Sequence, residues 1–468
     1  MDSHASALDV AAAIRSKEIS PVEVLDHYLD RVDRLDPGLN AFGLRDDERA
    51  RAEARAAADH VASTSVEDLA PFHGVPIPIK DLYDVAGWPT SHGSKASSDR
   101  PAQRDDLPIA RLRRAGFVLM GKTTTPELGA ISVTESDRFG ITRNPWNPDH
   151  TPGGSSGGAA AAVASGMAPV AHASDGGGSI RIPSSCTGLV GLKPSRNRVT
   201  SFVENLTAAA TQGVVTKDVA DAAALLDVLT EFDRGAWNVA PPPGRPFSSE
   251  LGLDPGRLRI RVSTSNALGV DAAPACVDAV RRMGDLLSDL GHDVVPEPPS
   301  WPDAGQFLTG FLTVWATSAA GAGLVDPSLL EAHNRAQYEE AQRTGSIDYV
   351  EAEILLQEAS REFTAQFGRD VDVVVSPTMA IEPPPVGSMW AGVEDDPMAP
   401  VTNCIPMATY TAVFNVCGLP AISLPTHVAD SGLPVGVQLA GPPWQDALLL
   451  RLASQIEAAR PWAALPDL

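Results

Sequence analysis

The chain has 468 residues, of which 43% are hydrophobic and 20% charged, a composition typical of a globular protein with a large core. Its formal net charge of −23 argues against nucleic-acid binding, which depends on clustered basic side chains. No stretch approaches the roughly 18 apolar residues of a membrane span, and the first residues lack the basic and apolar layout of a secretory signal. We therefore expect a cytoplasmic protein that binds neither nucleic acid nor a membrane.

The cysteines and histidines give no sign of a metal site. Cys186, Cys276, Cys404 and Cys417 lie far apart with no Cys-x-x-Cys spacing, and the ten histidines form no His-Glu-x-x-His pattern. This usage suits a reducing compartment. We expect no disulfide framework, no metal and no cofactor.

The first part of the chain predicts helices followed by buried strands. Ser20-Pro21 with Glu23 is a helix-start signal, and the Ala/Arg/Glu-rich segment 46–60 predicts another helix. Short apolar runs without polar alternation follow, and such runs are typical of strands covered on both faces. They occur at 75–79, 117–120, 168–173, 258–262, 371–375, 421–424 and 435–439.

The second half contains a long helical insertion between strands. Helical patterns are expected at 273–290 and 328–367, and the proline-rich segments 237–247 and 381–400 predict surface loops. The sequence thus predicts an α/β chain with a helix-rich, variable region at about 240–400.

One motif match is misleading. The segment Gly116–Thr123 satisfies the phosphate-loop pattern GxxxxGK[ST], but such a loop must be a flexible stretch between a strand and a helix. Here the intervening residues are the apolar run 117–120, and Pro126 constrains any helix that would follow. We expect no nucleotide site, with Lys122 at the end of a strand.

A second match is misleading for the opposite reason. The residues Gly153–Gly157 fit the GxSxG nucleophile elbow, which needs a hydrophobic strand leading directly into the serine. The preceding segment 147–152 is polar and broken by prolines. Ser155 is therefore not predicted to be an elbow nucleophile.

A third constellation combines a glycine-rich loop with a serine. The run 168–173 predicts a strand that delivers Asp175, three glycines (Gly176, Gly177 and Gly178) and Ser179. Consecutive glycines let main-chain N–H groups point into one concavity, where they can bind an oxyanion. Ser179 would then attack a carbonyl.

The serine needs a base, and Lys80 is the better candidate. His172 is nearer in sequence, but strand alternation argues against its facing the site. Lys80 follows the apolar run 75–79, where burial would lower the pKa of its amine. A neutral Lys80 could deprotonate Ser179 directly or through Ser155.

These motifs resemble the amidase signature family. GGSSGG at 153–158 and DGGGSIR at 175–181 place Ser155 and Ser179 in the family pattern, with GVPIPIKD at 74–81 upstream. The resemblance extends to GKTTTPELG at 121–129, FNVCGLPAISLP at 414–425 and GLPVGVQLAG at 432–441. Within the family, the chain is most similar to bacterial amidases of the 6-aminohexanoate cyclic-dimer hydrolase type.

The resemblance implies a fold and a set of site residues. The expected fold is a single α/β/α domain over residues 1–468, with a mixed central β-sheet covered by helices. The family pattern makes Ser179 the nucleophile, Ser155 the relay after a cis peptide bond, and Lys80 the base. The implied oxyanion hole comprises Gly176, Gly177 and Gly178, and the implied supporting residues are Gly154, Asp175 and Arg181.

The resemblance also implies an activity. We expect hydrolysis of the C–N bond of a small or medium carboxamide, linear or cyclic, through an acyl-enzyme, rather than peptidase activity. Carbamates or esters are alternative substrates, because the same chemistry attacks their carbonyl groups. A further alternative is an amidotransferase A-type subunit, although the segment 200–217 lacks the serine-leucine-aspartate stretch expected of one.

Substrate contacts are expected in the variable region. Trp315, Trp390 and Cys404 could line a pocket there, or could belong to the core. The expected partner is a small-molecule amide, and the chain is expected to be a monomer or a homodimer.

Overall fold

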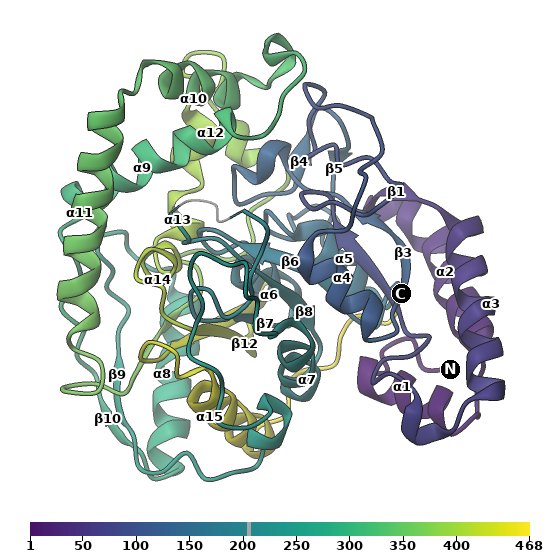
Figure 1. Cartoon of the computed structure of the whole chain (residues 1–468). Helices are drawn as coiled ribbons and strands as arrows, with labels where there is room; N and C mark the ends of the chain where they lie inside the picture. Colours follow the sequence, from purple (N-terminus) through teal and green to yellow (C-terminus); the bar gives the residue numbers. More distant parts are fainter. Residues whose placement is uncertain (204–206) are drawn as a thin grey trace.

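The computed structural model describes residues 1–203 and 207–468 (Figure 1). Within them the largest sheet has eight strands in the order β10-β9-β11-β13-β12-β7-β8-β6. It is mixed, because β9 runs parallel to β10 and β11 while the other pairs are antiparallel. The strands are β6 (Ala171–Asp175), β7 (Val190–Lys193), β8 (Thr211–Thr216), β9 (Arg259–Val262), β10 (Asp293–Val295), β11 (Val373–Pro377), β12 (Ala421–Val428) and β13 (Pro434–Ala440).

A three-stranded sheet in the order β1-β3-β2 continues the structure beyond β6. Its strands are β1 (Phe42–Arg45), β2 (Pro76–Lys80) and β3 (Val118–Thr123). Strand β2 lies against β6, so the end of β2 at Lys80 comes close to the end of β6. A short hairpin pairs β4 (Glu135–Ser136) with β5 (Gly140–Ile141).

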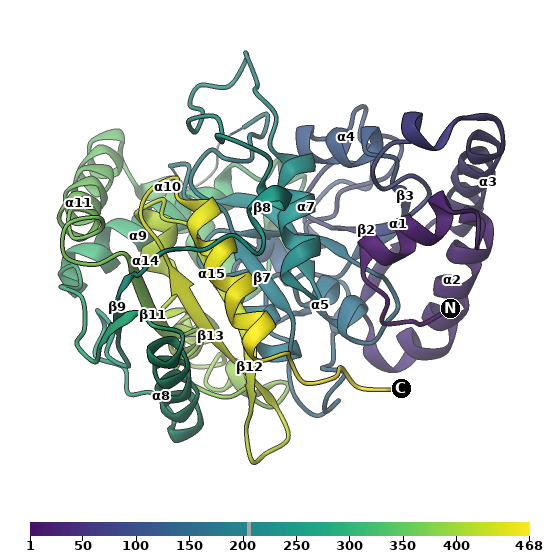
Figure 2. The same ribbon diagram turned by 90° about the horizontal axis from the view of Figure 1, so that it is seen from below.

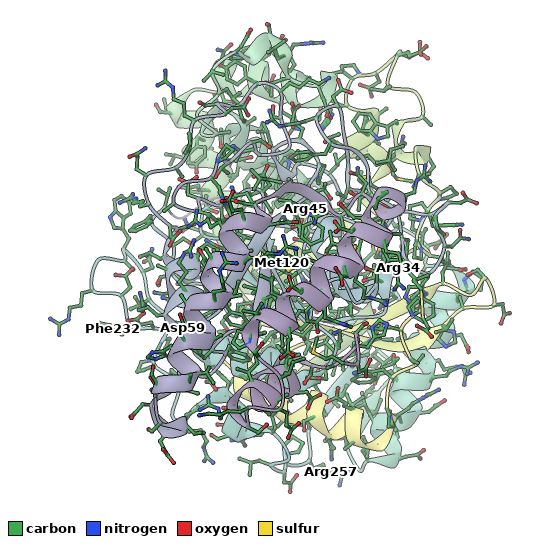
Figure 3. The ribbon with its side chains drawn as sticks, turned by 90° about the vertical axis from the view of Figure 1, so that its right-hand side faces the viewer. Arg34, Arg45, Asp59, Met120, Phe232 and Arg257 are labelled. Carbon is green, nitrogen blue, oxygen red and sulfur yellow. The ribbon has the colours of Figure 1, made fainter. Side chains whose placement is uncertain are left out.

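Helices cover the sheets and form the two ends of the molecule. Figure 1 shows α1–α3 at one side and α9–α11 at the other, and Figure 3 views the side that α2 and α3 cover. The view from below shows α7, α8 and α15 along the sheet (Figure 2). The longer helices are α1 (Ala7–Arg15), α2 (Pro21–Leu39), α3 (Asp47–Ser63), α4 (Leu107–Arg114), α5 (Gly157–Ala164), α6 (Arg181–Thr187), α7 (Val219–Leu229), α8 (Pro274–Asp289), α9 (Ala304–Ala320), α10 (Ala332–Arg343), α11 (Ser346–Thr364) and α15 (Asp446–Ala459).

Short helical turns complete the chain. They are α12 (Ala399–Asn403), α13 (Ile405–Ala408) and α14 (Ala412–Val416), with 3-10 turns η1 (Val66–Asp68), η2 (Glu127–Gly129), η3 (Phe247–Glu250), η4 (Pro327–Leu329) and η5 (Ser388–Trp390). The two chain ends lie close together, because the His4 ring is hydrogen-bonded to the carbonyl of Pro466 at 3.2 Å. Arg34 of α2 also donates a hydrogen bond to Leu468 at 3.1 Å.

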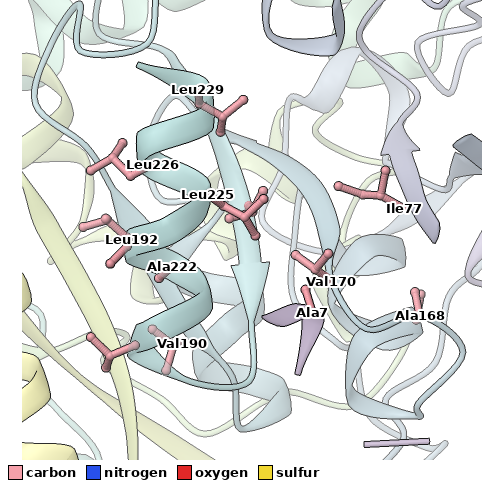
Figure 4. Close-up of a cluster of buried hydrophobic side chains, with 14 of the residues drawn as sticks. Ala7, Ile77, Ala168, Val170, Val190, Leu192, Ala222, Leu225, Leu226 and Leu229 are labelled. Carbon is pink, nitrogen blue, oxygen red and sulfur yellow. The ribbon is translucent and has the colours of Figure 1, made fainter. Parts of the chain in front are cut away.

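The main core lies between the sheet and its helices. Leu225 and Leu226 of α7 belong to the same buried cluster as Val190 and Leu192 of β7 (Figure 4). Burying an aliphatic side chain of this size is worth about 1.5–3 kcal/mol. This packing fixes β7 and β8 beside β6, the strand that leads into the glycine loop.

The predicted strands are found, with shifted ends at some of them. The run 168–173 becomes β6 at Ala171–Asp175, so the strand continues directly to the glycine loop. The run 117–120 becomes β3, which includes Lys122. Lys122 lies within a strand and not in a loop that leads into a helix, so the geometry of a phosphate loop is missing there. Ser155 likewise follows a loop rather than a strand.

The helix predictions hold in part. Ser20 caps α2 and forms a capping box with Glu23, as its sequence predicts. The pattern 328–367 is instead divided into η4, α10 and α11, with a break at Thr344 and Gly345. The sequence reasoning did not single out several elements, among them α7, α9, α15 and the strands β1, β7, β8 and β10.

Three further features of the described residues bear on the predictions. No helix among them is long and apolar enough to cross a membrane. All four cysteines are free. Among the described residues, no group of three or more His, Cys, Asp or Glu side chains is placed so that it could hold a metal ion. The segment 200–217 includes positions 204–206, which lie outside the described residues.

Candidate active site

The predicted site lies where β2 and β6 end. Strand β6 runs into the loop 176–179, and α6 begins at Arg181 directly after it. Gly176, Gly177 and Ser179 are half-buried, whereas Gly178 is buried. The loop is thus partly open to a ligand while its third glycine is packed into the protein.

Gly178 occupies a position that other residues cannot adopt without strain. Its φ is +137°, and a Cβ there would lie 2.4 Å from Thr411 Oγ1. Its N–H donates to Asp175 Oδ1 at 2.7 Å. This contact differs from the predicted oxyanion role of Gly178, because the same N–H cannot also face a ligand.

Asp175 and Arg181 form a buried ion pair that shapes the loop. Arg181 donates from Nε to Asp175 Oδ2 and from Nη2 to Oδ1, both at 2.9 Å. Both side chains are 0% exposed. Burial alone would raise the pKa of Asp175, but the Arg181 guanidinium outweighs it and lowers this pKa well below its usual range. Ile180 N–H also donates to Asp175 Oδ2, at 3.2 Å, so the carboxylate binds two amides around Ser179.

Remote segments complete this polar cluster. Arg181 Nη1 donates to Gln438 Oε1 at 2.6 Å, and Arg181 Nη2 donates to Asn415 Oδ1 at 2.5 Å. Asn415 Nδ2 in turn donates to Asp175 Oδ1 at 2.8 Å. Thr411 donates to the carbonyl of Gly177 at 2.5 Å. The loop is therefore held from β13 and α14 as well as from its own neighbours.

Lys80 lies at the end of β2 with its amine directed at two serines. Its Nζ donates to Ser155 Oγ at 2.8 Å and to Ser174 Oγ at 3.1 Å. Lys80 is 0% exposed, and this burial lowers the pKa of its amine from 10.5 to about 7, opposed by the charge of Asp175. About half of the molecules thus hold a neutral amine near pH 7.

The peptide bond between Gly154 and Ser155 is cis. Gly154 packs tightly, since a Cβ on it would lie 2.8 Å from Val133 N. Gly129, at the end of η2, lies next to Ser155, because a Cβ on Gly129 would be 3.2 Å from Ser155 Oγ. Ser155 is 2% exposed, and its hydroxyl accepts the hydrogen bond from Lys80.

The turn η2 is connected to the start of α10. Glu127 accepts hydrogen bonds from Ser94 Oγ at 2.6 Å, Glu331 N at 2.8 Å and Asn334 Nδ2 at 2.9 Å. Burial raises the pKa of Glu127, while these donors oppose the rise. The start of α10 is in this way joined to the turn that contacts Ser155.

The three predicted pocket residues separate into two places. Trp315 of α9 faces the glycine loop, because a Cβ on Gly177 would lie 3.9 Å from its ring. Cys404 instead belongs to a buried cluster with Val133 and is 5% exposed, and the half-buried Trp390 packs against this cluster. The ring of Trp390 also contacts His333 edge to face at 5.5 Å.

His172 is engaged elsewhere. Its Nε2 hydrogen-bonds Gln212 Oε1 at 2.9 Å, and burial lowers its pKa to about 3. Among the described residues its Nδ1 has no partner. Nothing in this arrangement connects it to either serine of the loop motifs.

Sequence reasoning missed Ser174, Glu127 and the remote partners of Arg181. Ser174 directly precedes Asp175 on β6. This position next to the glycine loop was the only local indication that Ser174 would accept a hydrogen bond from Lys80. Gln438 and Asn415 lie in the motifs at 432–441 and 414–425, but nothing local showed that they would contact Arg181.

Comparisons with known proteins identify the family of the chain. A family model described as Amidase matches residues 23–450. The chain is 35% identical over 478 residues to the 6-aminohexanoate-cyclic-dimer hydrolase of Paenarthrobacter ureafaciens, covering 97% of this chain and 94% of that protein.

Solved structures match over almost the whole chain. The structure of 6-aminohexanoate cyclic dimer hydrolase complexed with substrate has a TM-score of 0.93 at 32% identity, covering 99% of this chain and 98% of that one. A bacterial aryl acylamidase has a TM-score of 0.87 at 26% identity, covering 98% and 97%. The α/β fold with a mixed central sheet under helices is thereby confirmed. The chain belongs to the amidase signature family and is a hydrolase of amide C–N bonds.

Proposed function

We propose that the chain hydrolyses small or medium carboxamides through a Ser179–Ser155–Lys80 triad and an acyl-enzyme. The observation that carries the proposal is the 2.8 Å contact between Lys80 Nζ and Ser155 Oγ in a site that excludes water from the amine. A buried amine with a pKa of about 7 can accept a proton at neutral pH.

The partners of a second buried lysine differ from those of Lys80. Lys122 lies at the end of the neighbouring strand β3, where its amine is 3.1 Å from the carboxylate of Asp81 and donates to Thr90. An adjacent carboxylate favours the charged form of an amine. Within the described residues, Lys80 has hydroxyls and a carbonyl as hydrogen-bond partners and no carboxylate within 4 Å.

The proposed reaction proceeds in two stages. Ser155 passes its proton to Lys80 and takes the proton of Ser179, whose oxygen forms a bond to the amide carbon. The proton then returns through Ser155 to the leaving nitrogen as the C–N bond breaks. Water, deprotonated by the same relay, attacks the acyl-enzyme and releases the carboxylic acid and Ser179.

The oxyanion would be bound by main-chain amides of the glycine loop. Gly178 N–H is committed to Asp175, so we assign this role to the amides of Gly176, Gly177 and Ser179. Among the described residues, no hydrogen bond occupies the N–H of Gly176 or Gly177. Removing an oxyanion donor costs about 10²–10³-fold in kcat in comparable sites.

The test uses serine variants with a matched control. Ser179→Ala should abolish hydrolysis of a panel of alkyl and aryl amides, and Ser155→Ala should reduce it by about 10²–10⁴-fold. Ser184→Ala is the control, because this serine is buried on α6 and its hydroxyl has no hydrogen-bond partner among the described residues. Mass spectrometry should find an acyl adduct on Ser179. Unchanged turnover by Ser179→Ala would refute the assignment.

Assays on the same purified chain also distinguish the alternative functions. The triad chemistry also suits carbamates and esters, so the panel includes both. An amidotransferase A-type subunit would need its partner chains, whereas hydrolysis by the purified chain alone supports a stand-alone amidase. The four free cysteines support the predicted reducing, cytoplasmic location.

A further inference from the structure

Helix α9 carries three aromatic side chains spaced four residues apart. Phe307 and Phe311 stack with ring centres 5.8 Å apart, and Phe311 and Trp315 lie 5.3 Å apart. Side chains at this spacing lie on one face of a helix. They form a continuous aromatic row, which we call the α9 row.

The end of the α9 row reaches the glycine loop. A Cβ on Gly177 would lie 3.6 Å from Phe311 Cζ and 3.9 Å from Trp315 Cζ3. Glycine at this position leaves that space open. The two rings therefore border the stretch of backbone that is proposed to hold the oxyanion.

The row changes character along its length. Phe307 is 5% exposed and belongs to a buried core cluster with Leu356 and Phe363. Phe311 and Trp315 are half-buried, and so is Gly177. Rings that only filled the core would be covered at this end as they are at the other. Phe311 and Trp315 thus keep some exposed surface at the end of the row that lies near Gly177.

The opposite side of the loop is already occupied. The Thr411 hydroxyl donates to the carbonyl of Gly177 at 2.5 Å, and Gly178 packs against Thr411 and Ile182. The apolar rings of α9 are thus a free boundary of the loop. Pockets for small molecules are lined mainly by such apolar and aromatic side chains, with few polar groups.

We propose that Phe311 and Trp315 bind an aromatic or extended hydrocarbon group next to the scissile amide, so that the enzyme selects aryl and long-chain carboxamides over short ones. This inference rests on the proposed function, because it places the reacting carbonyl at the glycine loop. An aromatic ring buries 150–250 Å² and makes stacking contacts that a methyl group cannot replace.

The test compares two substrate series. One varies the acyl group, from acetamide through hexanamide to phenylacetamide, and the other varies the amine, from N-methylacetamide to acetanilide. The variants are Phe311→Ala, Trp315→Ala and the milder Trp315→Leu. Leu312→Ala is the matched control, since Leu312 lies on the same helix but is 46% exposed.

In at least one series, the ratio of kcat/KM for the large substrate to that for the small one should fall about tenfold in the alanine variants. The Leu312→Ala ratio should stay within about twofold of the parent. Melting temperatures identify a variant that fails to fold. If Trp315→Ala fails to fold, the ratio measured for Trp315→Leu is used instead. Unchanged ratios in both series would overturn the inference.

The two proposals fail in different ways. Ser179→Ala tests whether the triad acts at all, and its result does not depend on substrate size. If Ser179→Ala is inactive while Phe311→Ala and Trp315→Leu keep the parental ratios, the proposed function stands and the α9 row has no part in selectivity.

Discussion

The protonation of Lys80 should set the pH dependence of the enzyme. In water a lysine with a pKa of 10.5 would be neutral in about one molecule in 3,000 at pH 7, whereas a pKa of about 7 makes about half of them neutral. This difference corresponds to about 5 kcal/mol, and its cause is the removal of the amine from solvent. The buried position thus supplies a base that an exposed lysine could not.

The expected size of the pH effect on kcat/KM follows from the pKa of about 7 for Lys80. A base with a pKa of about 7 is neutral in about one tenth of molecules at pH 6 and in about nine tenths at pH 8. We therefore expect kcat/KM to rise about tenfold between these pH values and then to level off. The assay is ammonia release from a primary amide, measured at constant ionic strength from pH 5.5 to 9.

A variant separates Lys80 from other titrating groups. Lys80→Arg keeps the positive charge but replaces the amine with a guanidinium that stays protonated. It should lose about 10³-fold in kcat/KM at pH 8 and show no rise near pH 7, so the loss should be smaller at pH 6. A wild-type profile that is flat between pH 6 and 8, or one that is unchanged in Lys80→Arg, would refute this reasoning.

The other predictions concern stability and the loop. Because burial lowers the pKa of Lys80, its charge destabilises the fold fully below about pH 7 and less as the pH rises toward 10.5. Lys80→Met should therefore increase the free energy of unfolding by about 1–3 kcal/mol at pH 6, and urea denaturation at pH 6 and 10 should show the gain shrinking. Asp175→Asn should cost about 3–5 kcal/mol, since it leaves Arg181 buried without its counter-ion; a urea midpoint equal to the parent's would contradict this. Gly178→Ala should cost about 1–3 kcal/mol and most of the activity, because its Cβ would meet Thr411 at a φ of +137°; a fully active alanine variant would show that the loop can shift.

Local chemistry in the sequence was sufficient to predict the elements that end at the site. The uninterrupted apolar run before Lys80 indicated a buried strand, and β2 is buried at every position. The resemblance to a family then related Lys80, Ser155 and Ser179, which lie on separate segments. No periodicity could have done so, since it reports only neighbours along the chain.

The missed elements have sequences that suit more than one structure. Helix α9 contains Gly305 and Gly310 and three threonines, all weak helix formers, and its apolar residues are spread around the helix. Strand β8 includes Gly213 and β7 is four residues long, so neither shows a clear alternation. Tertiary packing decides these elements. The single-domain organisation over 1–468 stays a prediction.

The glycine loop shows where motif reasoning reached its limit. Three consecutive glycines suggested three equivalent donors, but Gly178 N–H is occupied by Asp175. The sequence contains both residues three positions apart, which permits a turn closed by the carboxylate. Deciding between a bound side chain and a free donor required the position of Arg181, which fixes the carboxylate.

The Asp175–Arg181 pair links the shape of the loop to the state of the base. The charge of Asp175 raises the pKa of Lys80, the opposite of what a general base at neutral pH requires. Arg181 donates to both oxygens of that carboxylate, and both side chains are 0% exposed. Much of the negative charge of Asp175 is therefore compensated within the pair. If the pair lost its cation, the uncompensated charge of Asp175 would favour the charged amine of Lys80 more strongly. One buried ion pair therefore holds the amides around Ser179 and leaves Lys80 available to take a proton.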